Sequence, residues 1–194
     1  MALGKQAKTL TKGQIEAVLG YLASTRHPKR NKLIFLLSVK AGLRAKEIAG
    51  LTWRMTNDSE GNIGRTLYVF DSASKGNSGR TIPMTEEVRN ALVEYRDEVL
   101  SFAGPHVIGT ERGLKTSPQV IVNMFFRWYR HLGFYGCSSH SGRRTFITNA
   151  ARKISTVGGS LRDVQELAGH SSLRTTQRYI DANPEAQLRI VELV

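Results

Sequence analysis

The chain has 194 residues, 40% of them hydrophobic and 23% charged, which is ordinary for a globular domain with a core of its own. Its charge balance is unusual, because 28 Lys and Arg against 16 Asp and Glu leave a formal net charge of +12. That excess suits a polyanionic partner, most commonly nucleic acid, although an anionic membrane surface or a ribosomal assembly would also satisfy it. The single cysteine, Cys137, excludes an intramolecular disulfide framework and a multi-thiolate metal site.

The sequence shows neither a signal peptide nor a membrane anchor. The first eleven residues include lysines but no apolar core of the kind that a signal peptide needs. The longest apolar run, Leu33 to Leu37, is far too short to cross a bilayer. On these grounds we expect a cytoplasmic protein.

Helix signals recur along the first half of the chain. Thr11 and Gln14 have the spacing of a capping box, and apolar residues follow at helical intervals. Pro28 suits the first turn of a second helix, which Gly42 would end. A short helix over residues 45–49 is expected directly afterwards.

A β-hairpin and further helices are expected in the rest of the chain. Two β-rich runs, residues 66–70 and 80–84, flank a stretch dense in turn-forming residues. Helical spacing then predicts helices that begin at Thr85 and near Pro118, a helix over 140–153 capped by Ser138 or Ser139, a helix over 161–168 capped by Ser160, and short helices around Tyr179 and after Pro184. The fold class is therefore α+β, mainly α-helical with a small antiparallel β-sheet.

Three patches place polar side chains where chemistry could use them. Arg44 begins a short helix directly after a chain reversal marked by glycine. His140 and Arg143 lie three residues apart, so a helix projects them from one face. His170 and Tyr179 follow later in the chain. Taken singly, each has an ordinary structural explanation, such as a solvated arginine, a capping histidine or an amphipathic tyrosine.

Taken together, the patches closely resemble the signature of the tyrosine recombinase (phage integrase) family. Residues 42–48 match its first box, Gly-Leu-Arg-x-x-Glu-Ile. The His-x-x-Arg box matches at His140 and Arg143. The family's Gly-His with a Tyr nine residues later matches at His170 and Tyr179.

The resemblance also covers the predicted hairpin. The family carries a lysine in the hairpin turn, with an Arg and a Pro shortly afterwards, and Lys75, Arg80 and Pro83 fit that pattern. The match spans roughly Leu10 to Ala182 in the family's order. The resemblance therefore implies the tyrosine recombinase catalytic-domain fold over most of the chain.

The chain departs from the family pattern at several positions. Ala168 replaces the usual Leu before Gly-His, and Gly142 replaces a frequent Leu, which we expect to loosen the start of that helix. Arg144 stands where a His is common, outside the catalytic set. Family members usually carry an N-terminal helical domain that clamps DNA. Only about ten residues precede the catalytic domain here, so that domain was removed or this is a small single-domain member.

The resemblance implies site-specific DNA recombination or integration by metal-free transesterification. Tyr179 is the expected nucleophile, and it would form a 3′-phosphotyrosyl intermediate that preserves the bond energy for religation. Arg44 and Arg143 suit the charge that builds on the phosphate, because guanidinium matches phosphate oxygens bidentately. No cofactor, metal or ATP is expected, because the arginines supply the charge that Mg²⁺ would bring.

The other catalytic roles concern proton transfer and phosphate contact. Lys75, at the tip of the hairpin, is a plausible general acid for the leaving 5′-oxygen. His140 is the expected acid/base partner of Tyr179, because imidazole titrates near working pH. His170 is expected to donate a hydrogen bond to the phosphate. The expected catalytic set is Arg44, Lys75, His140, Arg143, His170 and Tyr179.

We expect a basic N-terminal segment (1–10), the catalytic domain (11–182) and a C-terminal tail helix (183–194). The partner is double-stranded DNA, and the resemblance implies a tetramer on paired DNA sites, with a monomer free in solution. Whether the tail packs on its own domain or on a neighbouring protomer stays open. Two alternatives also remain: DNA relaxation of the type IB topoisomerase kind, and a non-catalytic DNA-binding regulator that kept the fold.

Overall fold

The computed structural model describes residues 6–70, 79–99, 104–110, 113–180 and 191–192. In chain order the elements are α1 (Lys12–Ala23), α2 (Pro28–Val39), α3 (Ala45–Gly50), the 3₁₀ turn η1 (Trp53–Met55), β1 (Thr66–Val69), β2 (Arg80–Pro83), α4 (Glu86–Val99), α5 (Pro118–His131), α6 (Ser141–Lys153), the 3₁₀ turn η3 (Ile154–Val157), α7 (Leu161–Ala168) and α8 (Leu173–Gln177). Among the described residues, no helix combines the length and apolar character that a bilayer crossing requires.

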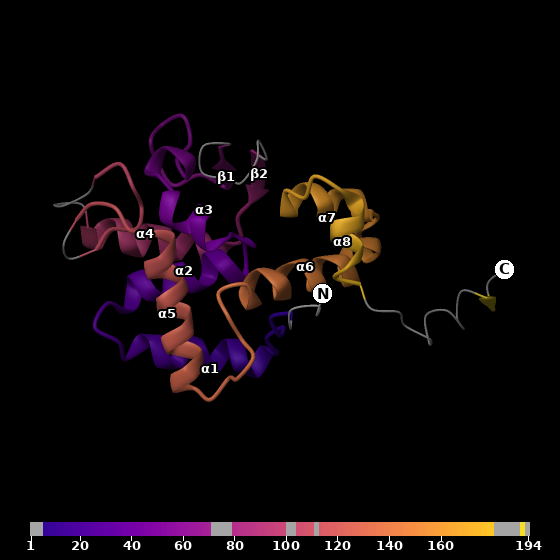
Figure 1. The fold of residues 1–194 in the computed structure, drawn as a ribbon. Coiled ribbons are helices and arrows are strands. Elements are labelled where there is room, and N and C mark those ends of the chain that lie inside the picture. The colour runs from indigo at the N-terminus through magenta and orange to yellow at the C-terminus, as the bar shows by residue number, and fades with distance from the viewer. Residues whose placement is uncertain (1–5, 71–78, 100–103, 111–112, 181–190, 193–194) are drawn as a thin grey trace.

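Helix α2 is the centre of the main core. Its residues Leu33 to Leu37 are fully buried, and the helix packs against α1, α4 and α6 (Figure 1). A helix segment that is buried on every side, as this run of five residues is, is typical of such a central position. Helix α5 covers α3 and also joins this core, where the ring centroids of Phe35 and Phe125 lie 6.4 Å apart.

The helix starts follow the predicted capping signals closely. Thr11 and Gln14 form the expected capping box of α1, and Ser160 caps α7 with Asp163 as its reciprocal partner. Pro28 is the first residue of α2, as predicted. The prediction that Gly42 ends α2 was wrong, because the helix already stops at Val39. Gly42 instead has a φ of +65° in the reversal toward α3.

The sheet consists of β1 and β2, which pair antiparallel with Leu67 opposite Ile82. Both of these side chains are buried in the main core, while Tyr68, between Leu67 and Val69, is exposed. The mostly helical fold with a small antiparallel sheet is therefore confirmed. The hairpin turn that carries Lys75 lies outside the described residues.

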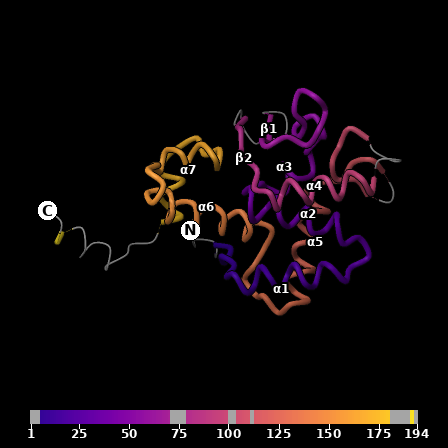
Figure 2. Tube along the Cα trace, turned by 180° about the vertical axis from the view of Figure 1, so that it is seen from behind, coloured from indigo at the N-terminus to yellow at the C-terminus, as the bar shows by residue number. Residues whose placement is uncertain are grey.

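The last part of the chain forms a smaller unit beside the main core. Helices α7 and α8 lie to one side of the body formed by α1 to α5, and α6 joins the two parts (Figures 1 and 2). Among the described residues, the buried apolar cluster of this smaller unit consists of Ile147, Val164 and Ala168. Tyr179 packs against this cluster. The nucleophile predicted from the sequence thus lies on the smaller core.

Two local predictions in this region were wrong. Helix α6 begins at Ser141, with His140 in the N-cap position and without a side-chain cap. Neither predicted serine caps it, because the Ser138 hydroxyl accepts a hydrogen bond from the His140 backbone within the preceding turn (3.3 Å). Helix α8 ends at Gln177, so Tyr179 lies in a turn instead of a helix. The predicted helix after Pro184 lies outside the described residues, apart from 191–192.

Gly142 does not loosen the start of α6. It is buried inside the helix, and a Cβ built on it would lie 2.4 Å from the Ser38 hydroxyl of α2. The missing side chain therefore lets α6 pack closely on the central helix. This contact places the first turn of α6, with Arg143, against the main core.

Candidate active site

A buried carboxylate organises the site. Glu47, in the first turn of α3, has a side chain only 1% exposed. It accepts hydrogen bonds from the backbone N–H and the guanidinium of Arg44, both at 2.8 Å. It also accepts a bidentate pair from Arg80, at 2.8 and 3.0 Å. One carboxylate thereby fixes two arginines that are 36 residues apart in the sequence.

The charge state of Glu47 follows from these contacts. Burial by itself raises the pKa of the carboxyl, but the hydrogen bonds and positive charges of Arg80 and Arg44 outweigh burial and lower the pKa to about 2. Glu47 is therefore ionised at any working pH. A buried charge of this kind is tolerated because both of its oxygens are paired.

The C-terminal end of α7 receives three arginines. Its last backbone carbonyls have no partner within the helix. Leu167 O accepts from Arg80 Nε at 2.9 Å, Ala168 O accepts from Arg143 Nη2 at 2.6 Å, and Gly169 O has a longer contact of 3.5 Å with Arg44 Nη2. The negative end of the helix dipole stabilises such cations. This helix end therefore brings side chains from α3, β2 and α6 to one place.

Arg143 is the most enclosed of the predicted cations that the structure describes. Its side chain donates to Gly42 O at 2.7 Å as well as to Ala168 O, and the residue is 4% exposed. Burial first, and then the charges of Arg44 and Arg80, lower the pKa of the guanidinium to about 9. It is still a cation at neutral pH. The described cluster thus holds three guanidinium groups against one carboxylate, an excess that favours an anionic ligand.

His170 follows directly after α7. Gly169, at φ +61°, turns the chain out of the helix. The backbone N–H of His170 then donates to Gln165 O at 3.1 Å, and the side-chain amide of Gln165 donates to His170 O at 2.9 Å. The ring Nδ1 lies 3.0 Å from the Thr176 hydroxyl. Burial, with the charges of Arg143, Arg44 and Arg80, lowers the pKa of His170 to about 4. His170 is therefore a neutral imidazole at neutral pH.

Tyr179 is half-buried beside this histidine. The two rings are stacked, with centroids 5.5 Å apart and an interplanar angle of 22°. The guanidinium carbon of Arg144 lies 5.7 Å from the centroid of the tyrosine ring, and Arg144 also donates a hydrogen bond to the Gln6 side chain.

Five of the six predicted residues line a single pocket of about 590 Å³: Arg44, His140, Arg143, His170 and Tyr179. The exposed His140 stands at the start of α6, one turn before the buried Arg143. Glu47 and Arg80 do not line the pocket. They support it through Glu47, which binds Arg80 and also the pocket residue Arg44. Lys75 lies outside the described residues, so the structure does not place it.

Sequence reasoning missed two residues that contact the predicted set: Arg144, which lines the pocket, and the buried Thr176, whose hydroxyl lies against His170 Nδ1. Arg144 was set outside the catalytic group, although its neighbour Arg143 is one helix position away. Thr176 carried no sequence signal at all, because a buried threonine three residues before a tyrosine is common. The family box did include Glu47 but suggested no role for it. Its role is visible only from the two arginines that it binds.

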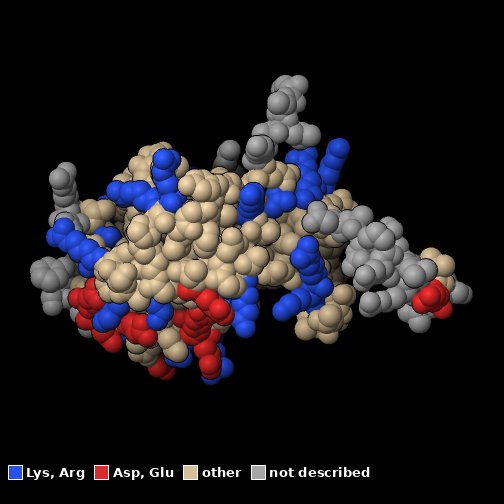
Figure 3. Space-filling view, turned by 90° about the horizontal axis from the view of Figure 1, so that it is seen from below, with Lys and Arg blue, Asp and Glu red and all other residues tan. Residues whose placement is uncertain are grey.

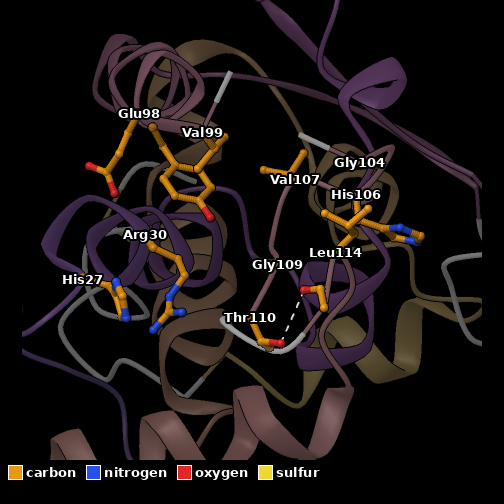
Figure 4. A pocket seen from close by; sticks show the side chains of 12 residues that line it. His27, Arg30, Glu98, Val99, Gly104, His106, Val107, Gly109, Thr110 and Leu114 are labelled. Atoms are coloured by element: carbon orange, nitrogen blue, oxygen red, sulfur yellow. Dashed lines mark hydrogen bonds between the residues drawn. The ribbon is translucent and has the colours of Figure 1, made fainter. Parts of the chain in front are cut away.

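A second hollow, of about 440 Å³, lies at the other end of α2 (Figure 4). Its walls include His27, Arg30, Glu98 and the loop around Thr110, whose hydroxyl bonds to Gly113 O. It contains none of the residues predicted from the sequence. Within the described part of the chain, no three His, Cys, Asp or Glu side chains are grouped as metal ligands would be.

Charge is unevenly distributed over the surface. In Figure 3, Asp and Glu side chains gather mainly along one lower edge, where Lys and Arg accompany them. Lys and Arg side chains also project from the upper edge and the middle of that face. Lysines of α2 and acidic residues of α4 form exposed pairs, such as Lys32 with Glu94 at 3.0 Å and Lys29 with Glu98 at 3.5 Å. Much of the acidic charge is thereby compensated away from the pocket.

Comparisons with known proteins agree with this geometry. The profile of the phage integrase family matches residues 8–186, and the chain therefore belongs to that family. Tyrosine recombinase XerC of Bradyrhizobium diazoefficiens is 33% identical over 166 residues, which cover 83% of this chain and 48% of that protein. Tyrosine recombinase XerA of Thermococcus onnurineus is 30% identical over 183 residues, 92% of this chain and 59% of that protein. The chain thus spans about half the length of the curated relatives it matches.

Solved structures show the same fold. A crystal structure of XerA recombinase matches with a TM-score of 0.71 at 24% identity, covering 95% of this chain and 64% of that one. The Tn1549 transposon integrase, in complex with transposon right end DNA, matches with a TM-score of 0.75 at 21% identity. That match covers 94% of this chain and 64% of the integrase. The tyrosine recombinase catalytic-domain fold expected from the sequence is confirmed.

Proposed function

We propose that this chain is the catalytic part of a site-specific recombinase that breaks and rejoins double-stranded DNA through Tyr179. The observation that carries the proposal is the single pocket in which Arg44, His140, Arg143, His170 and Tyr179 meet. These residues come from separate segments, and Arg44 and Tyr179 are 135 residues apart in the sequence. The relatives named as tyrosine recombinases, and the integrase structure that contains transposon DNA, support this substrate class.

The arginines are suited to binding the phosphate that is cut. Arg44 and Arg143 line the pocket, and their backbone and carboxylate contacts hold them in place before any ligand arrives. Because guanidinium groups match phosphate oxygens, they would neutralise charge on the two non-bridging oxygens. Donors that are already in place stabilise a transition state by about 3 kcal/mol each.

The remaining residues serve the transfer itself. The Tyr179 hydroxyl attacks phosphorus, the bond to the 5′-oxygen breaks, and a 3′-phosphotyrosyl link forms. His140 takes the tyrosine proton, and Lys75 protonates the leaving 5′-oxygen. His170 is neutral because of its lowered pKa, and so it acts as a hydrogen-bond donor to the phosphate instead of as a second cation. The reverse reaction rejoins the strand.

The assembly and the place of action are part of the same proposal. Residues 1–10 form a basic segment, 11–182 the catalytic domain, and 183–194 a tail. The protein acts in the cytoplasm on nucleoid DNA, is monomeric in free solution, and forms a tetramer on paired DNA sites. A small tail helix gives a weak interface by itself, which favours assembly on DNA over assembly in solution.

The test is covalent trapping on a suicide substrate nicked near the cleavage site. Wild type should form a protein–DNA adduct, and Tyr179→Phe should form none while it binds DNA with affinity within about two-fold of wild type, because only a hydroxyl is lost. Tyr135→Phe, at a tyrosine that is 76% exposed, is the matched control and should trap normally.

Undiminished trapping by Tyr179→Phe would refute the assignment of the nucleophile. Binding without any adduct from wild type would favour the non-catalytic regulator. Trapping and relaxation without strand exchange between paired sites would favour the type IB topoisomerase alternative.

A further inference from the structure

Arg144 lies between the ring of Tyr179 and the side chain of Gln6 and contacts both. It follows Arg143 on α6 and lines the same pocket, but it points to the nucleophile instead of to the carbonyls of α7. Its guanidinium carbon lies 5.7 Å from the centroid of the Tyr179 ring. A cation at this distance from an aromatic face is attracted by the electrons of the ring.

The arginine is itself held by the chain that precedes α1. Gln6 accepts a hydrogen bond from Arg144 Nη1. The segment that carries Gln6 is tied down twice: the Lys8 N–H donates to Gly136 O at 3.1 Å, and the Leu10 N–H donates to the Thr145 hydroxyl at 2.8 Å. The start of the described chain lies beside α6 in both backbone views (Figures 1 and 2). Gln6 is therefore fixed at the rim of the pocket.

Among the described residues, few other contacts of Tyr179 could set the direction of its ring. It lies in a turn after a five-residue helix, next to a cluster of three buried apolar residues. The stacked His170 is one neighbour of the ring, and the Arg144 guanidinium is another. A half-buried ring with so few partners depends on each of them for its orientation.

We propose that Arg144 is a positioning residue for Tyr179 and that Gln6 holds the Arg144 guanidinium over the ring. The catalytic part of this inference rests on the proposed function, whereas the positioning of the ring does not. The pair also links the segment before α1 to the nucleophile. A change at Gln6 is thereby passed to Tyr179 without any contact between the two residues.

The first test separates positioning from phosphate binding through the rate of trapping at saturating DNA. Arg144→Met should slow this first-order rate by about two- to five-fold, the effect expected from an exposed cation–π contact. Arg144→Lys keeps a cation and should recover most of the rate, and Gln6→Ala should slow it by less than Arg144→Met. Lys153→Met removes an exposed cation from the same helix, outside the pocket, and should leave the saturated rate unchanged.

The second test observes the ring directly and needs no DNA. All six tyrosines of the full chain are replaced by 3-fluorotyrosine, and the Tyr179 signal in the fluorine NMR spectrum is the one lost in Tyr179→Phe. Arg144→Met and Gln6→Ala should each shift this signal, and Lys153→Met should leave it unchanged. Gln6→Ala keeps the test decisive if Arg144→Met does not fold.

The two readouts separate the two claims. A shifted signal together with a slower saturated rate supports the positioning role. An unshifted Tyr179 signal, or a loss that appears only in DNA affinity, overturns it and makes Arg144 a phosphate contact. If wild type never traps DNA, the proposed function fails, but the NMR result still decides whether Arg144 orients the ring.

Discussion

The two halves of the pocket are the arginine wall, which Glu47 and Arg80 support without lining it, and the turn that carries Tyr179, and they are built differently. The cations Arg44, Arg80 and Arg143 are bonded to Glu47 or to backbone carbonyls, and the side chains of Arg80 and Glu47 are 4% and 1% exposed. Tyr179 lies in a turn, is half-buried and packs on the smaller apolar cluster. Buried charges must be fully paired to be tolerated, whereas a nucleophile must be able to reach its target. The half that is fixed by hydrogen bonds therefore holds charge, and the lightly packed half holds Tyr179, the proposed nucleophile.

The largest effect is expected from removing the charge that holds the arginine wall. Glu47→Gln removes the counter-ion of Arg80, whose side chain is buried, and of the partly exposed Arg44, which should destabilise the fold by about 3–5 kcal/mol. If the arginines of the pocket bind the scissile phosphate as proposed, trapping on the suicide substrate should fall by about 10²-fold or more, because they lose their fixed geometry. Denaturant unfolding and trapping rates measure the two effects.

Glu94→Gln is the matched control for this change. Glu94 forms an exposed ion pair with Lys32 at 3.0 Å, and its loss should cost less than about 1 kcal/mol. The pH dependence should also differ. Because the pKa of Glu47 is lowered to about 2, its contribution to stability is present above the ordinary pKa of 4.5 and is lost as pH falls toward 2. Equal stability of the two variants would show that Glu47 does not organise the cluster.

An intermediate effect is expected from the smaller core. Ile147→Ala should remove about 2–4 kcal/mol from the packing of α6 on α7. Since the described residues beyond α6 have few other buried contacts, amide exchange in α7 should accelerate by at least about ten-fold while α2 stays protected. Native-state hydrogen exchange measures both helices in one experiment.

Leu36→Ala, in the centre of the main core, is the comparison for Ile147→Ala. It should lower the protection of α2 and α7 together, since loss of the main core unfolds the whole chain. If Ile147→Ala accelerated exchange equally in both helices, the two cores would unfold as one unit, and the contrast between the two halves of the pocket would have no basis in local stability.

The smallest effect is expected from His170, which lies between the two halves. Burial and the neighbouring arginines lower the pKa of His170 to about 4, below its ordinary value of 6.5. As pH falls through this window the unfolded chain takes up a proton before the folded one, so stability is lost between about pH 6.5 and 4. His170→Gln should lose less stability over the same range, as urea unfolding at several pH values would measure. Parallel pH curves for wild type and variant would contradict the lowered pKa.

Local signals in the sequence predicted much of the fold. The capping box at Thr11, the Ser160 cap and Pro28 all stand where the structure places helix starts, because such signals act within one helical turn. Two of the predictions that were wrong, the serine cap of α6 and the helix around Tyr179, also concern contacts within a few residues. The Ser138 hydroxyl bonds inside its own turn instead of capping α6, and the chain turns before Tyr179 because α8 stops at Gln177.

The sequence by itself determined the family and five residues that share the pocket, because the family's motifs are defined by residue types at fixed spacings along the chain. Only the tertiary structure decided that Glu47 joins Arg44 to Arg80 and that three successive carbonyls at the end of α7 receive three arginines. It also decided that Arg144 lies over Tyr179. These partners are between 3 and 125 residues apart, and the contacts depend on how α3, β2, α6 and α7 pack together. No pattern along the chain records the packing that brings those side chains within hydrogen-bonding distance.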